Sequence, residues 1–151
     1  MSMRDDFPDL PPVWATGFGA AAWLAGVFMP IWRFEASALN AVALLLAIAG
    51  LALAGWAVFW FWRRRTPIEP NEIPACLIVE GPFRLNRNPI YSAMILILAG
   101  LALWSGALSA LIVVAFFPPL MTRRFIRAEE RVLLQSFGQQ AEAWFARTRR
   151  W

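Results

Sequence analysis

The sequence contains no histidine and no lysine, and its 151 residues include a single cysteine. Without histidine, imidazole-based acid–base chemistry is excluded, and so are most zinc sites. Cys76 has no second cysteine with which to form a disulfide within the chain. Charged residues make up only 16% of the chain, and none of its segments reads as a soluble module with a basic face. We therefore expect no metal site and no nucleic-acid partner.

Hydrophobic residues are abundant instead: they form 60% of the chain, which also contains nine tryptophans. This content exceeds that of ordinary soluble domains and predicts an all-α integral membrane protein of one domain with about four transmembrane helices. Gly50 and Gly55 would let another helix approach the second of these closely, and loose packing against lipid is the alternative. The predicted segments are transmembrane helices over 13–32 and 38–62, a cytoplasmic loop over 66–88, a helical hairpin over 89–117 and an amphipathic helix over 120–151.

The hairpin is predicted from a break in an apolar stretch. Trp104-Ser105-Gly106 separates the arms Ile90 to Leu103 and Ala107 to Phe117, each marginal in length for a span. Pro118-Pro119 is expected to end the second arm. A single long helix through the break is the alternative, but two short arms agree better with the charge pattern.

Arginine positions predict the orientation in the membrane. Arg33 lies between the first two helices, the hairpin turn has no charge, and the other thirteen arginines lie at the amino end, in the central loop or in the tail. Because positive residues are retained inside, both termini, the central loop and the active site are expected to be cytoplasmic. The amino end, with Asp5, Asp6 and Asp9, lacks the basic region of a secretory signal and is expected to remain in the mature protein.

A polar segment, Glu80 to Tyr91, lies between two of the apolar runs. Gly81-Pro82 predicts a turn, and Pro89 is suited to the first turn of a helix, where its missing N–H costs nothing. Arg84 and Arg87 lie within a few residues of the predicted hydrocarbon region. They either contact lipid phosphates or belong to a functional site.

The tail has helical periodicity, with an apolar stripe typical of a helix that lies on the membrane or on the bundle. At about 100° per residue, Glu129 falls within this stripe and Glu130 at its edge. A carboxylate there is costly unless a cation or a hydrogen-bond donor meets it. A salt bridge to Arg127 or Arg131 is the structural alternative to a binding role. Gly138 is a candidate interruption of this helix.

The chain resembles the isoprenylcysteine carboxyl methyltransferase and phospholipid methyltransferase superfamily from roughly Thr66 to its carboxyl end. The resemblance rests on an ordered set of motifs: Gly81-Pro82-Phe83-Arg84, then Arg87-Asn88-Pro89-Ile90-Tyr91, an apolar hairpin, Glu129-Glu130 and Phe137-Gly138. It implies a membrane-embedded methyltransferase that uses S-adenosyl-L-methionine, with the cofactor between the central loop, the hairpin and the carboxyl-terminal helix. No Rossmann sheet is expected, since the chain lacks a G-x-G-x-x-G sequence.

Carried over by position, the resemblance implies one set of cofactor-binding residues, in which Glu129 matches the acidic residue that holds the cofactor. Three arginines are candidates for positioning the acceptor as catalytic residues: Arg84, Arg87 and Arg124. Ala75, Asn88 and Phe125 differ from the isoprenylcysteine branch, so prenylated-protein substrates are not implied. The expected cofactor-binding residues are Leu77, Ile78, Gly81, Phe83, Asn88, Pro89, Tyr91, Glu129 and Glu130.

The expected partners are membrane lipids, with a lipophilic methyl acceptor that enters from the bilayer. A carboxylate acceptor is already ionised at neutral pH, whereas an amine must lose a proton to Glu130, Tyr91 or water, which favours carboxyl O-methylation. One alternative is an NADPH-dependent membrane reductase of the sterol-reductase type. The other is a small four-helix transporter or scaffold, which is disfavoured because none of the four apolar runs contains an acidic residue.

Overall fold

A computed structural model describes residues 9–35, 37–68 and 74–151. Asp5 and Asp6, from which the amino end is predicted to lack a secretory signal, lie outside these ranges, as does part of the predicted central loop. Within them the fold is helical, with one isolated β-bridge and no strand. The elements are α1 (Pro11–Phe28), α2 (Ser37–Arg64), the 3₁₀-helix η1 (Gly81–Arg84), α3 (Pro89–Trp104), α4 (Leu108–Ala115), α5 (Phe117–Met121), the π-helix η2 (Thr122–Ile126), α6 (Arg127–Phe137) and α7 (Gln139–Arg147).

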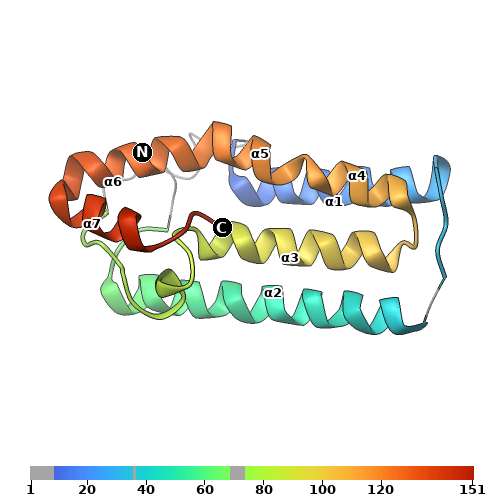
Figure 1. Ribbon diagram of the computed structural model, residues 1–151, viewed down its shortest axis with the longest axis horizontal. Coiled ribbons are helices and arrows are strands. Elements are labelled where there is room, and N and C mark those ends of the chain that lie inside the picture. Colours follow the sequence, from blue (N-terminus) through green and yellow to red (C-terminus); the bar gives the residue numbers. More distant parts are fainter. Residues whose placement is uncertain (1–8, 36, 69–73) are drawn as a thin grey trace.

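The long helices run roughly parallel to one another in an elongated bundle (Figure 1). α3 occupies the middle, with α2 packed on one side and with α1 and α4 packed together on the other. The turn between α3 and α4 lies at one end. The loop that follows α2, together with η1, α6, α7 and the carboxyl end, lies at the opposite end.

Glycine permits the close contact between α2 and α3. A Cβ placed on Gly50 would lie 2.8 Å from the backbone oxygen of Ala93, and one on Gly100 would lie 2.6 Å from that of Ala43. Side chains at these two positions would therefore force the helices apart. The prediction for Gly50 is confirmed, whereas Gly55 has open space around it and supports no such contact.

Prolines lie at the start of α1 and just beyond its end. Pro11 and Pro12 occupy its first turn, where their missing N–H groups are tolerated. It ends at Phe28, earlier than the predicted Trp32, because Met29 precedes Pro30 and a residue before proline is disfavoured in helical conformation.

The predicted hairpin is confirmed: α3 ends at Trp104 and α4 returns from Leu108. Its turn is fixed to the connection between α1 and α2, where the Phe34 N–H donates to the Gly106 oxygen at 2.9 Å and the Leu108 N–H donates to the Trp32 oxygen at 2.9 Å.

The prediction that Pro118-Pro119 ends the second arm is wrong. Helix continues from Leu108 to Phe137, because both prolines lie in the first turn of α5, where a missing N–H costs little. The π-helical turn η2 then follows, a local change of helical register of the kind that often occurs at functional sites. The predicted amphipathic helix is therefore joined to the hairpin arm. It is interrupted at Gly138, as expected, by a residue with φ of +48°.

Two helices in the described part of the chain are long and apolar enough to cross a membrane: α2, with 28 residues, and the continuous helix Leu108–Phe137, with 30. α3 is apolar but has 16 residues, and α1 has 18. Many apolar side chains of α2, including Leu45 and Trp62, are exposed. The all-helical fold is confirmed for the described residues, while the number of spans stays a prediction.

Candidate active site

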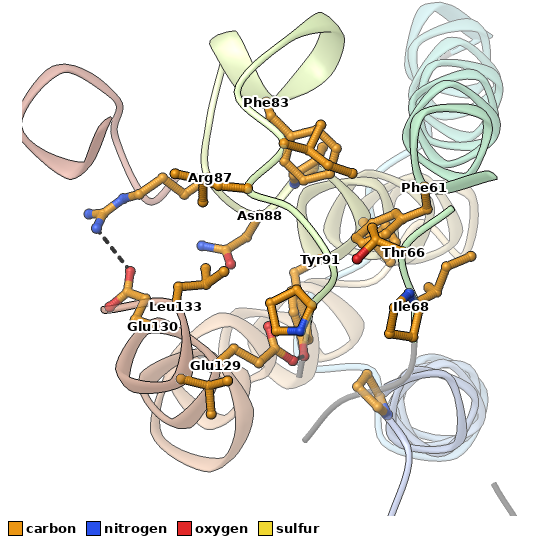
Figure 2. A pocket seen from close by; sticks show the side chains of 18 of the residues that line it. Phe61, Thr66, Ile68, Phe83, Arg87, Asn88, Tyr91, Glu129, Glu130 and Leu133 are labelled. Atoms are coloured by element: carbon orange, nitrogen blue, oxygen red, sulfur yellow. Dashed lines mark hydrogen bonds and ion pairs between the residues drawn. The ribbon is translucent and has the colours of Figure 1, made fainter. Parts of the chain in front are cut away.

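A cavity of about 390 Å³ lies at the end of the bundle where α2 ends and α3 begins. Its volume falls within the range typical of small-molecule sites, roughly 300–1,000 Å³. The amino end of α1, the loop after α2, the start of α3, α6 and α7 all contribute to its walls (Figure 2). Its lining residues are Leu10, Pro11, Pro12, Phe61, Thr66, Pro67, Ile68, Pro74, Cys76, Leu77, Ile78, Phe83, Arg87, Asn88, Pro89, Ile90, Tyr91, Met94, Glu129, Glu130, Val132, Leu133, Trp144 and Phe145.

Glu129 and Tyr91 form a hydrogen-bonded pair in the cavity wall. The Tyr91 hydroxyl donates to Glu129 Oε1 at 2.5 Å, and the tyrosine is 7% exposed. Tyr91 lies in the first turn of α3 because Pro89 begins that helix, and Glu129 lies in the first turn of α6. The carboxylate is thus met by a hydroxyl, not by the Arg127 or Arg131 salt bridge that was the alternative for it.

Glu130 joins two arginines that lie far apart in the sequence. Its carboxylate is 3.1 Å from a terminal guanidinium nitrogen of Arg87, and it accepts hydrogen bonds from Arg150 at 3.0 and 2.6 Å. Its partners are therefore not the neighbouring arginines expected from helical spacing. Burial lowers the pKa of Arg87, an effect that Glu130 opposes, whereas hydrogen bonding to Glu130 raises the pKa of Arg150. Both guanidinium groups are cations, as arginines are throughout proteins.

The carboxyl-terminal segment is hydrogen-bonded to the residues just before α3 through its backbone oxygens. The Arg87 N–H donates to the Arg149 oxygen at 2.8 Å, and the side-chain amide of Asn88 donates to the Arg150 oxygen at 3.1 Å. The Arg87 guanidinium also lies 4.5 Å from the ring centroid of Phe145. The loop and tail therefore form one rigid wall.

Aromatic side chains form an apolar slot on another side of the cavity. Phe61, near the end of α2, meets Phe83 of η1 edge to face, with centroids 5.5 Å apart. The Trp144 indole N–H donates to the Phe83 oxygen at 3.2 Å and fixes α7 to η1. Ile78 is buried against these rings. Such a slot suits a flat, weakly polar group.

Gly81 lets η1 lie directly against Trp60. Its φ is +58°, and a Cβ there would lie 2.0 Å from the indole nitrogen. A side chain is excluded both by the backbone conformation and by the indole. The predicted turn is thus confirmed, and its glycine positions the loop from outside the cavity.

The loop after α2 is also closed at its base. Thr66 is buried, and its hydroxyl oxygen accepts a hydrogen bond from the Ala75 N–H at 2.9 Å. This bond joins the two sides of the loop and keeps Thr66 and Cys76 at the cavity wall.

Nine of the twelve predicted site residues line this one cavity. Gly81, Arg84 and Arg124 do not line it, and Arg84 is exposed on η1. Phe125, which stands where the isoprenylcysteine branch has an arginine, is buried in the core next to Arg124. The nine that do are Leu77, Ile78, Phe83, Arg87, Asn88, Pro89, Tyr91, Glu129 and Glu130.

Arg124 instead pairs with the residue before α1. Its guanidinium donates to both carboxylate oxygens of Asp9 at 2.8 and 2.7 Å. Asp9 also accepts from the Trp14 indole N–H at 3.0 Å. Hydrogen bonds from Arg124 keep the pKa of Asp9 below its usual value. The pair fastens the start of α1, and with it Leu10, to η2.

Several lining residues were not predicted: Leu10 and the prolines that begin α1, Phe61, Thr66 and Trp144. Arg150, which is bound to Glu130, was missed as well. Phe61 and Trp144 carried a weak signal, since both are aromatic and lie near the ends of predicted helices. The position of Arg150 depends on the tail folding back, for which the sequence has no local signal. In the described ranges no three potential metal-binding side chains come together.

Comparisons with known proteins agree with this arrangement. Residues 38–140 match the family described as phospholipid methyltransferase. A curated relative is the cobalt-zinc-cadmium resistance protein CzcN of Cupriavidus metallidurans, which is 28% identical over 119 residues, or 79% of this chain. The chain spans about half of that relative's length, 53%. No solved structure matches the chain. Since the family match covers more than half of the chain and carries Phe83, Tyr91 and Glu129, this protein belongs to the phospholipid methyltransferase family.

Proposed function

We propose that the protein is a membrane methyltransferase that binds S-adenosyl-L-methionine in this cavity and methylates a lipid or lipid-like acceptor drawn from the bilayer. The observation that carries the proposal is the Tyr91–Glu129 pair in the wall of a mostly apolar cavity, where the carboxylate has one hydroxyl partner among the described residues. A carboxylate in such surroundings is retained at a cost in stability, which a cationic ligand offsets.

The cavity fits the cofactor chemically. An ammonium and vicinal ribose hydroxyls require a carboxylate and further hydrogen-bonding groups. Glu129 supplies the carboxylate, and the Tyr91 oxygen can accept while its hydrogen is donated to Glu129. The Asn88 amide has an oxygen and a second N–H besides the N–H that it donates to the Arg150 oxygen. An adenine ring requires an apolar slot, and Phe61 and Phe83 provide one. When bound, the cofactor supplies an electrophilic methyl group on a sulfonium.

The residues of this chain contribute binding, orientation and exclusion of water. Methyl transfer is accelerated chiefly by holding the nucleophile and the methyl group in line in a dry site. Glu129 fixes the charged part of the cofactor, and the tail closed over Arg87 and Asn88 keeps water from one side. No step requires an acid–base residue when the acceptor is ionised.

An anionic acceptor is favoured by the state of the possible bases. Glu130 is occupied by two arginines, and the Tyr91 hydroxyl is committed to Glu129. Both are poorly placed to take a proton from an amine. Arg87 lines this mostly apolar cavity as a cation, and we assign it the role of orienting a carboxylate. Carboxyl O-methylation is therefore the reaction we favour.

We further propose that α1, α2, α3 and the helix from Leu108 all cross the membrane. At about 1.5 Å per residue, the 18 residues of α1 and the 16 of α3 span about 27 and 24 Å, close to the ~30 Å of hydrocarbon. The cavity lies at the end that carries Arg63, Arg64 and Arg65. We expect this end to face the cytoplasm, because positive residues are retained on that side of a membrane.

Calorimetric titration of the purified protein with S-adenosylhomocysteine, beside NADPH, tests the cofactor. Saturable binding of the homocysteine compound is expected, and binding of NADPH in its place would transfer the chain to the reductases. Binding of neither would favour a transporter or scaffold. Transfer of tritiated methyl groups to S-farnesyl-N-acetylcysteine and to phosphatidylethanolamine then tests the acceptor. Methylation of the amine lipid alone would overturn the carboxylate assignment.

A further inference from the structure

A second hollow lies on the outer face of the bundle, between α1 and α4. It is an apolar groove of about 620 Å³ lined by Val13, Trp14, Gly17, Phe18, Ala21, Val113 and Phe116. Gly17 has open space beside it, since a Cβ there would have nothing within 4 Å. The groove faces outward: Val13 is 36% exposed and Phe116 is 64% exposed. It therefore opens toward the hydrocarbon of the bilayer if α1 and α4 cross the membrane.

The groove leads toward the cofactor cavity along one face of α1. At about 100° per residue, Trp14, Gly17 and Ala21 lie on one face of α1. Leu10 directly precedes the helix, and its backbone oxygen accepts a hydrogen bond from the Trp14 N–H at 3.2 Å. Leu10 lines the cavity, while Trp14 lines the groove. From Trp14 to Ala21 the face extends about 10 Å along the helix axis.

Polar groups mark the end of the groove nearest the cavity. Asp9 and Arg124 form their ion pair there, with side chains 42% and 48% exposed. The Arg124 guanidinium also lies 5.7 Å from the ring centroid of Trp14. An apolar channel with an indole, a carboxylate and a guanidinium at one end is complementary to an amphiphile: its chain lies in the groove and its head meets the charges.

We propose that the groove binds one hydrocarbon chain of the methyl acceptor and aligns its head with the cavity. This inference rests on the function proposed above and adds the place where the acceptor is held. The occupant is the acceptor and not bulk lipid, because the groove runs along the α1 face to Trp14, which is hydrogen-bonded to a residue of the cofactor cavity, and has charged groups where the head would lie.

The experiment fills the groove at Gly17. Gly17→Leu projects a side chain into the hollow, and leucine is a better helix former than glycine, so folding is preserved. Gly55→Leu is the matched control: it is also a helical glycine with open space, but it lies on α2, away from the groove. Gly17→Ala adds one methyl group and tests whether size matters. Titration with S-adenosylhomocysteine checks that each variant keeps its cofactor site.

Methyl transfer is measured with whichever acceptor is methylated, S-farnesyl-N-acetylcysteine or phosphatidylethanolamine, and with the same head on a short chain. Gly17→Leu is expected to raise KM for the long-chain acceptor about tenfold, the effect of losing contact with about two methylene groups. We expect kcat, cofactor affinity and the Gly55→Leu values to stay near wild type. Equal KM values for Gly17→Leu and Gly55→Leu would overturn the proposal.

Direct binding separates failure of this proposal from failure of the proposed function. Two probes are used in phosphatidylcholine nanodiscs, an S-prenyl-N-acetylcysteine with a diazirine on its prenyl chain and a phosphatidylethanolamine with a diazirine on its acyl chain. Each is photolysed and the labelled peptides are mapped. Saturable labelling of residues 13–21 that the methylated acceptor competes away, and that Gly17→Leu suppresses, supports an acceptor site. Labelling spread evenly over α1 and α2, or saturable labelling in a protein that binds no S-adenosylhomocysteine, overturns it.

Discussion

Removing the charge of Glu129 is the most direct test of the cofactor site. Glu129→Gln keeps the size of the side chain, and the amide oxygen can still accept the hydrogen bond that the Tyr91 hydroxyl donates at 2.5 Å. The wall of the cavity is therefore expected to keep its shape. What is lost is the negative charge offered to the cationic part of the ligand.

The magnitude follows from the kinds of hydrogen bond that are exchanged. A hydrogen bond to a charged group contributes about 1.5–3 kcal/mol, and one between neutral groups about 0.5–1.5 kcal/mol. The midpoints of these ranges differ by about 1.3 kcal/mol, so the substitution should weaken binding by roughly that amount, which is nearly tenfold in Kd. The thermal stability of the unliganded protein should not fall, because the variant removes a carboxylate that is retained at a cost in stability and makes no cavity.

Calorimetric titration with S-adenosylhomocysteine measures the effect, with thermal unfolding of the unliganded protein measured in parallel. Glu142→Gln is the matched control, since it removes the same charge at an exposed position on α7. An affinity of Glu129→Gln within about twofold of Glu142→Gln would refute the placement of the cofactor. A large loss of stability would show that the carboxylate is structural.

Three further predictions concern the framework of the site. Gly81→Ala should lower the free energy of unfolding by about 1–3 kcal/mol, because Gly81 has a positive φ and lies against the Trp60 indole. Gly55→Ala, at a helical position with open space, should be neutral or stabilising. Equal changes in the two variants, measured by thermal unfolding, would contradict this prediction. Arg124 lowers the pKa of Asp9, so Asp9→Asn should be less stable than wild type above the ordinary pKa of the carboxyl group. This difference in the free energy of unfolding should vanish as the pH falls through the lowered pKa. A difference that does not depend on pH would refute the pairing. Glu130→Gln should lower the free energy of unfolding at neutral pH by about 1–2 kcal/mol, because two partly exposed arginines lose their carboxylate partner. An unchanged unfolding midpoint would contradict this prediction.

The parts of the site that could be predicted from sequence are those with a local signal. Glu129 is conspicuous as a carboxylate within an apolar helical stripe, and Pro89 marks the first turn that carries Tyr91. The hairpin followed from a polar break in an apolar run. In each case helical periodicity or the chemistry of a few adjacent residues was enough.

The parts that could not be predicted depend on contacts between distant residues. The Asn88–Arg150 hydrogen bond joins residues 62 positions apart, and the Trp144–Phe83 bond joins residues 61 apart. Helical spacing offered Arg127 or Arg131 as a partner of Glu130, but the carboxyl-terminal segment folds back so that Arg150 pairs with it, together with Arg87. The helix through Pro118-Pro119 was missed for another reason: a proline ends a helix only where an N–H is needed, and these two lie in the first turn of a new segment.

The family match and the cavity together suggest which parts of the chain bind the cofactor and which select the acceptor. The match covers residues 38–140, which include Phe83, Tyr91 and Glu129. Leu10, Pro11 and Pro12 lie outside it, yet they line the same cavity and begin the helix that bears the outer groove. Cofactor binding is thus expected of the matched part. The choice of acceptor is expected to depend on α1, so exchanging α1 between family members should change the acceptor while leaving S-adenosylhomocysteine affinity nearly constant.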